Sequence, residues 1–220
     1  MHSAPDLSWP HLAKFIRHHT HDVRNSLNSL DLEASMIAEL IPEGEAGESA
    51  RRIRAQIRRL AADLRALAAK FAEPRPSRAP CAAHELLLIW QDQLAALDPA
   101  PTVQWGDTPA GAEVNVDATA LANVFRELLT NAHAFGNGSP LLATVRIKDG
   151  HVAFELREPK DAPIETASWG HAPFASLRQG HYGLGLWEAQ RTIAASGGEV
   201  QRRFSLDAME LITTLSFPAA

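Results

Sequence analysis

Two apolar stripes with helical spacing constrain the fold of this 220-residue chain more than any other feature. The first stripe repeats every seven positions and again four positions after each: Ile16, Thr20, Val23, Leu27, Leu30, Ala34, Ile37 and Ile41. The second stripe has the a and d spacing of a coiled coil: Ile53, Ile57, Leu60, Leu64, Leu67 and Phe71. The spacing predicts two amphipathic helices, over residues 11–41 and 48–71.

The break between the stripes, PEGEAG at residues 42–47, has the proline and glycines of a loop. A connection this short makes the two helices antiparallel neighbours. A lone hairpin of two long amphipathic helices cannot cover both stripes well. We therefore expect a homodimer in which two hairpins form a four-helix bundle.

His21 stands away from the first stripe. At about 100° per residue, its side chain projects roughly 120° from the centre of the stripe. Asp22 follows directly, and Asn25 lies one turn further on the same side. The imidazole is therefore predicted to be accessible to other molecules. Two other interpretations of the residues are a surface histidine without a role and a metal site shared among His11, His18, His19 and His21.

Composition limits the class of protein. Hydrophobic residues make up 45% of the chain and charged residues 21%, which is ordinary for a globular protein. A net charge of −5 does not favour nucleic acid as a partner, and the single Cys81 excludes an internal disulfide. No apolar run approaches the roughly 20 residues of a membrane span. We expect a cytoplasmic protein.

The proline-rich stretch EPRPSRAP, residues 73–80, reads as a linker between a helical unit over 1–72 and a second unit over 81–220. In the second unit, helical patterns alternate with patterns of extended strands. Helices are predicted over 82–97, 118–135 and 183–196, and strands over 101–106, 113–117, 199–205 and 209–217, with a hairpin over 141–158. This order predicts an α+β fold with a mixed sheet and helices on one face.

Two clusters in the second unit suggest chemistry. Glu127 and Asn131 are four residues apart on one helix edge, where their oxygens could hold a hydrated Mg²⁺ or orient a phosphoryl acceptor. Gly183 and Gly185 open the last predicted helix, where backbone N–H groups can approach phosphate. Taken singly, each cluster also fits a plain surface pair or a plain helix cap.

Three segments together resemble the conserved boxes of sensor histidine kinases. HDVRN at 21–25 resembles the H-box, RELLTNA at 126–132 the N-box, and GHYGLGL at 180–186 the G2 box. PFASLRQG at 173–180 is similar to the F-box that precedes the ATP lid. The resemblance implies a dimerisation and phosphoacceptor hairpin followed by an α/β sandwich of the GHKL ATPase type.

The resemblance also implies roles for single residues. His21 would accept a phosphoryl group from ATP and pass it to an aspartate of a response regulator receiver domain. Asp22 would orient its ring, and Asn25 would orient water for the reverse, dephosphorylating reaction. Glu127 would polarise the attacking group. The residues that would bind Mg²⁺ or the nucleotide are Asn131, Gly183 and Gly185.

The chain departs from the family at the G1 box, which normally reads Asp-x-Gly-x-Gly and contacts adenine. The corresponding segment, residues 158–163, contains no glycine. Glu158 is the candidate for the adenine contact, and Asp161 is a second candidate out of register. An alternative function therefore stays open, in which a dimeric histidine phosphotransferase relays phosphate between receiver domains without binding ATP.

Overall fold

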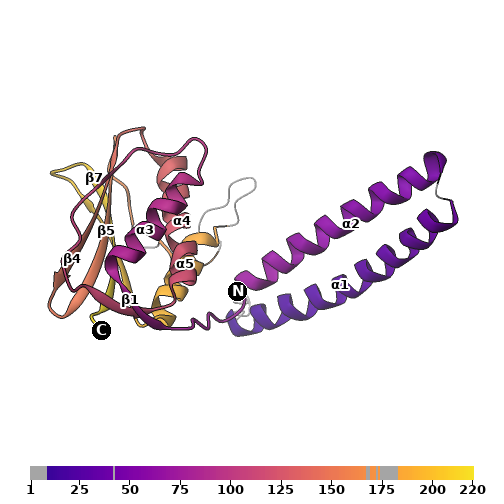
Figure 1. Cartoon of the computed structure of the whole chain (residues 1–220), viewed down its shortest axis with the longest axis horizontal. Helices are drawn as coiled ribbons and strands as arrows, with labels where there is room; N and C mark the ends of the chain where they lie inside the picture. The colour runs from indigo at the N-terminus through magenta and orange to yellow at the C-terminus, as the bar shows by residue number, and fades with distance from the viewer. Residues whose placement is uncertain (1–8, 42, 167–168, 172, 174–182) are drawn as a thin grey trace, which may run out of the picture. The chain divides into compact units, whose positions relative to one another are not determined.

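The computed structural model describes residues 9–41, 43–166, 169–171, 173 and 183–220 (Figure 1). The chain divides into two compact units, Met1–Glu73 and Pro74–Ala220. In the described part of the chain, no helix combines the length and hydrophobicity that crossing a bilayer requires.

The first unit is an antiparallel hairpin of two long helices, α1 (Trp9–Leu40) and α2 (Gly44–Lys70) (Figure 1). The side chains along the seam are small or aliphatic, which lets the helices approach closely. On α1 the buried residues are Ala13, Thr20, Leu27 and Ala34, and on α2 they are Gly47, Ala50, Ile57 and Ala61. The predicted antiparallel hairpin is confirmed.

The predicted loop over residues 42–47 is wrong in length, because α2 begins at Gly44 and not at residue 48. Gly44 has a φ of +82°, a left-handed conformation that suits glycine at the turn. Gly47 is buried where the helices come together, so it is a packing glycine inside the helix rather than a loop residue. Glu45, in the first turn of α2, then favours the start of the helix electrostatically.

One side of the hairpin leaves apolar side chains uncovered. Helix geometry places the exposed members of both stripes on the same side of the seam. These residues are 47–49% exposed: Leu30, Ile37, Ile53 and Leu60. Each helix thus buries part of its stripe against the other helix and leaves part of it open.

The second unit contains a five-stranded sheet in the order β2-β4-β5-β7-β6. Its strands are β2 (Val103–Trp105), β4 (Leu141–Lys148), β5 (His151–Pro159), β6 (Glu199–Ser205) and β7 (Glu210–Pro218). The β2–β4 pair is parallel and the other pairs are antiparallel. Helices α3 (Ala83–Ala95), α4 (Ala118–Phe135) and α5 (Gly185–Ala195) cover one face of the sheet (Figure 1).

A separate two-stranded ribbon pairs β1 (Ala79–Ala82) with β3 (Glu113–Val116). Residues 79 and 80, which the sequence analysis assigns to the linker, therefore belong to this ribbon. Ser77 and Arg78, which precede β1, also form hydrogen bonds within the second unit. The Ser77 N–H donates to the Asp117 carboxylate at 2.8 Å, and the Arg78 guanidinium donates to the Ala195 carbonyl at 2.5 Å.

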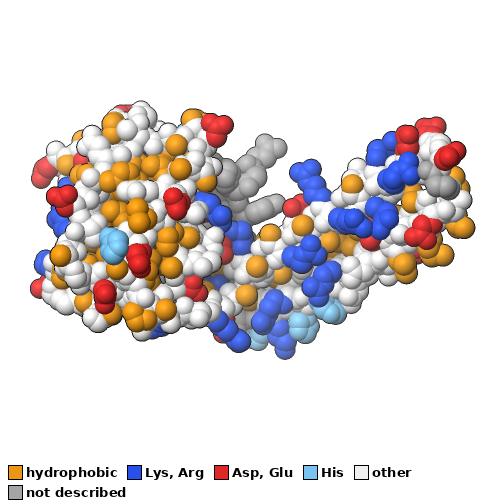
Figure 2. Space-filling view, viewed as in Figure 1, with side chains coloured by type: hydrophobic (Ala, Val, Ile, Leu, Met, Phe, Trp, Pro, Cys, Tyr) orange, Lys and Arg blue, Asp and Glu red, His pale blue; other side chains and the backbone are white. Residues whose placement is uncertain are grey.

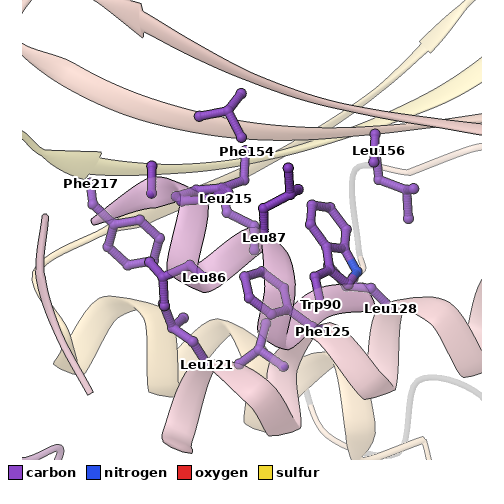
Figure 3. Packing of buried hydrophobic residues seen from close by; sticks show 14 of the residues in the cluster. Leu86, Leu87, Trp90, Leu121, Phe125, Leu128, Phe154, Leu156, Leu215 and Phe217 are labelled. Atoms are coloured by element: carbon purple, nitrogen blue, oxygen red, sulfur yellow. The ribbon is translucent and has the colours of Figure 1, made fainter. Parts of the chain in front are cut away.

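The core of the second unit lies between the helices and the sheet (Figure 3). The ring of Trp90 stacks on Phe125 with centroids 4.6 Å apart, and Phe125 contacts Phe154 of β5 at 6.0 Å. These rings tie α3 and α4 to the sheet. The predicted mixed sheet with helices on one face is confirmed.

Candidate functional site

His21 lies on the exposed surface of α1, with 59% of its side chain accessible. Its Nδ1 is 3.4 Å from Asp22 Oδ1 and 3.4 Å from Asn25 Nδ2. Both neighbours therefore approach the same ring nitrogen. In the described part of the chain, Nε2 has no hydrogen-bond partner, so it is the nitrogen open to an incoming group.

The two contacts require opposite forms of the ring. When Nδ1 carries the proton it can donate to Asp22, and Nε2 then holds the free lone pair of a nucleophile. When Nδ1 accepts from Asn25, the proton of a neutral ring sits on Nε2, which is then not nucleophilic. Asp22 thus favours the reactive tautomer and Asn25 the unreactive one.

In the second unit, Glu127 and Asn131 lie one turn apart on α4, both partly buried. The Asn131 Nδ2 donates to Glu127 Oε1 at 2.8 Å. This bond fixes the carboxamide so that its oxygen faces away from the carboxylate. Carbonyl and carboxylate oxygens are suitable Mg²⁺ ligands, so the pair fits that ion.

Gly185 opens α5 directly against Glu127. A Cβ built at Gly185 would collide with the Glu127 carboxylate, so glycine lets the carboxylate keep its present position against the start of α5. Gly183, two residues earlier, has a φ of +62°, which also favours glycine. The fold therefore brings together Glu127, Asn131 and the glycine turn at the start of α5, where the helix dipole favours negative charge.

Glu158 lies at the end of a core-facing row on β5. Alternate residues of the strand point to the same face, and the row runs through three buried apolar residues before reaching two charged ones: Val152, Phe154, Leu156, Glu158 and Lys160. The Lys160 Nζ lies 3.1 Å from Glu158 Oε2. Burial raises the pKa of Glu158, and the nearby charges of Lys160 and Arg202 act in the opposite direction.

The sequence analysis did not single out Lys160 as a site residue. The period-two alternation of β5 could have predicted it. The alternation continues one position past the strand and places the side chain of residue 160 on the core face. Asp161 is exposed instead, and its carboxylate accepts a hydrogen bond from Asn137 Nδ2 at 2.8 Å. Most of the predicted F-box segment 173–180, and residues 180–182 of the predicted G2 box, lie outside the described residues.

Basic side chains gather on the face of the hairpin that Figure 2 shows. Arg54 and Arg58 both reach Asp31 on α1, with N–O distances of 3.2 and 3.7 Å. These pairs link the two helices on the side of the seam opposite the uncovered apolar residues. In the described residues, no group of three or more His, Cys, Asp or Glu side chains comes together as a metal site.

No protein-family model and no curated protein matches the chain. Solved structures do match its fold. Full-length ShkA in complex with AMPPNP aligns with a TM-score of 0.64 at 20% identity, over 94% of this chain and 46% of that chain. The chain thus spans about half the length of ShkA.

Two further structures are described as histidine kinases. The mycobacterial sensor histidine kinase MprB aligns with a TM-score of 0.54 at 16% identity, over 64% of this chain and 97% of that chain. The catalytic domain of histidine kinase ThkA gives the same score and identity over 65% of this chain and 96% of that chain. At these identities the likeness shows the fold alone: the second unit has the α+β architecture that the sequence predicted, and solved histidine kinase structures share it.

Proposed function

We propose that the chain is a histidine kinase of a two-component system, with His21 as the phosphoacceptor. The observation that carries the proposal is the arrangement at His21, where both neighbouring side chains approach Nδ1 and leave Nε2 open. The fold shared with histidine kinases supports it, as does the convergence of Glu127, Asn131 and Gly185.

The proposed reaction is an in-line transfer of the ATP γ-phosphoryl group to His21. The Nε2 lone pair forms the new P–N bond while the bond from phosphorus to the bridging oxygen breaks and ADP leaves. Asp22 accepts the hydrogen bond of the Nδ1 proton and stabilises the charge that develops on the ring. Positioning and charge neutralisation supply most of the catalysis in reactions of this class.

Asn131 would hold Mg²⁺ through its carboxamide oxygen, and a bound Mg²⁺ would neutralise phosphate charge. The backbone at Gly183 and Gly185 would receive the phosphate groups at the positive end of α5. Glu127 fixes the carboxamide of Asn131. Glu158 would contact the base, with Asp161 as the second candidate.

The phosphoryl group would next pass to an aspartate of a response regulator receiver domain, with release of the imidazole. The edge of α2 that carries Arg51, Arg54, Arg58 and Arg65 is the surface we propose for this acidic partner. The uncovered apolar side chains of α1 and α2 support a homodimer, because a second hairpin would cover them.

A second candidate function is a phosphotransferase that receives its phosphoryl group from a receiver domain rather than from ATP. The Glu158–Lys160 pair favours it, because a carboxylate already paired with an internal ammonium is less available to a base. In this function His21, Asp22 and the dimer keep their roles.

The test uses the full chain with two phosphoryl donors. We expect γ-labelled ATP with Mg²⁺ to label the protein, and His21→Ala to abolish the label while His18→Ala, an exposed neighbour on α1, keeps it. Label that survives His21→Ala contradicts the proposal. Label that reaches His21 from a phosphorylated receiver domain but not from ATP supports the second candidate.

A further inference from the structure

Lys160 is a buried lysine that the proposed reaction does not use. It follows β5 directly, and its side chain is only 6% exposed, while that of Glu158 is 8% exposed. Its Nζ lies 3.1 Å from Glu158 Oε2 and donates to the Phe135 carbonyl at 2.9 Å, at the C-terminal end of α4. A buried ammonium is costly unless it is paired, and both partners here are within the second unit.

The bond from Lys160 to Glu158 is of the same kind as the bond that a nucleotide base would make to Glu158. A base with an exocyclic amino group would donate an N–H to the Glu158 carboxylate, and the Lys160 ammonium makes the same kind of bond with a full positive charge. Hydrogen bonds from charged donors are stronger than neutral ones. Because Lys160 is tethered two residues away, it also meets Glu158 at a high effective concentration.

We infer that Lys160 is an internal competitor for Glu158, so that a purine nucleotide binds only when the lysine side chain is displaced. The inference rests on the proposed function, in which Glu158 is the base contact. It makes Lys160 a residue that lowers nucleotide affinity without touching the phosphates.

Removing Lys160 does not leave Glu158 without a positive neighbour. Arg202 lies close enough to counter the effect of burial on the pKa of Glu158. Its Nη1 donates to the Trp169 carbonyl at 3.2 Å, and its Nη2 is buried without a hydrogen-bond partner among the described residues. Arg202 can therefore take over part of the charge compensation.

The main experiment measures binding of Mg-ATP by titration calorimetry to the full chain and to Lys160→Met, which keeps the length of the side chain. We expect the substitution to raise the affinity at least tenfold. The matched control is Lys148→Met, at the exposed end of β4, which should leave the affinity unchanged. Unchanged or weaker binding by Lys160→Met, or no binding by either protein at millimolar ligand, overturns the inference.

A second measurement uses the unmodified protein, in case Lys160→Met does not fold. Reductive methylation followed by mass spectrometry should find Lys160 protected without ligand and more reactive with saturating Mg-ATP, while Lys148 reacts equally in both. Rapid methylation of Lys160 in the free protein, or no change on saturation, overturns the inference. Labelling of His21 is scored separately: tighter binding by Lys160→Met without any label on His21 would refute the kinase proposal and leave this inference standing.

Discussion

Asp22 and Asn25 meet at a single atom, the Nδ1 of His21, each from 3.4 Å. The two contacts cannot form at once, because Nδ1 either donates a proton or accepts one. The residues beside His21 therefore act against each other in setting the tautomer of its ring.

This opposition predicts different results for the two substitutions. Asp22→Asn should slow phosphorylation of His21 by about 100-fold or more. This is the range expected when a side chain that takes part in general acid–base catalysis is lost. Asn25→Ala should leave phosphorylation within about threefold but lengthen the lifetime of the phosphorylated protein. Both rates are measured with labelled phosphoryl donor, with Asn28→Ala, also exposed on α1, as the control. Equal losses of phosphorylation in both variants would contradict the assignment.

The uncovered side of the hairpin predicts which leucines hold the dimer together. Leu30→Glu should weaken dimerisation by about 100-fold, because about 3 kcal/mol of apolar burial is lost across the two copies. Leu32→Glu is the matched control, since Leu32 is 64% exposed and projects from the opposite side of α1. Sedimentation equilibrium gives both constants. If the two variants dissociate alike, the dimer uses another face.

Gly185 predicts a coupling between α4 and α5. Alanine normally stabilises a helix relative to glycine by about 0.5–1 kcal/mol, but its Cβ here would collide with the Glu127 carboxylate. Gly185→Ala should therefore push the Glu127 carboxylate aside and break its hydrogen bond from Asn131, at a cost of about 1 kcal/mol in the free energy of unfolding. The double variant Gly185→Ala/Glu127→Ala should recover most of that loss. Additive effects in urea denaturation would show that the two residues do not interact.

Asp117 predicts a pH-dependent loss of stability. Hydrogen bonds from the backbone N–H groups of Ala120 and Ser77 hold the pKa of Asp117 below its ordinary value. Asp117→Ala removes this cap and should cost about 1–2 kcal/mol at neutral pH. Because the folded pKa is lowered, the contribution is present above pH 3.8, the ordinary value, and is lost as the pH falls through the lower folded pKa.

Urea denaturation of wild type and Asp117→Ala at several pH values measures this difference. It should shrink steadily in acid. Asp107→Ala, at an exposed position, is the control and should stay within about 0.5 kcal/mol of wild type at neutral pH. A gap between wild type and Asp117→Ala that persists at the lowest pH would show that the carboxylate charge is not what stabilises α4.

Local patterns were sufficient to predict most of the elements. Helix α4 agrees with its predicted bounds because a capping aspartate precedes it and its apolar residues keep helical spacing to Phe135. The start of α2 was missed because Gly44 and Gly47 have the composition of a loop. Only the packing of α1 against α2 shows that Gly47 lies inside a helix.

The site was predicted only as far as neighbouring residues could reveal it. The Glu127–Asn131 pair follows from their spacing on one helix, whereas the contact between Glu127 and Gly185 joins segments almost sixty residues apart and depends on the fold. The Lys160 pair was missed for another reason. The sequence drew attention to the absent glycines of residues 158–163 and not to the alternation that turns Lys160 toward the core.

The uncovered apolar side of α1 and α2 affects the stability of the protein in dilute solution. If a second copy covers that side, the stability of the hairpin depends on how much protein is present. Its thermal midpoint should then rise with concentration, while that of the independently packed second unit should not. Dilution alone would then destabilise the hairpin whose first helix carries His21.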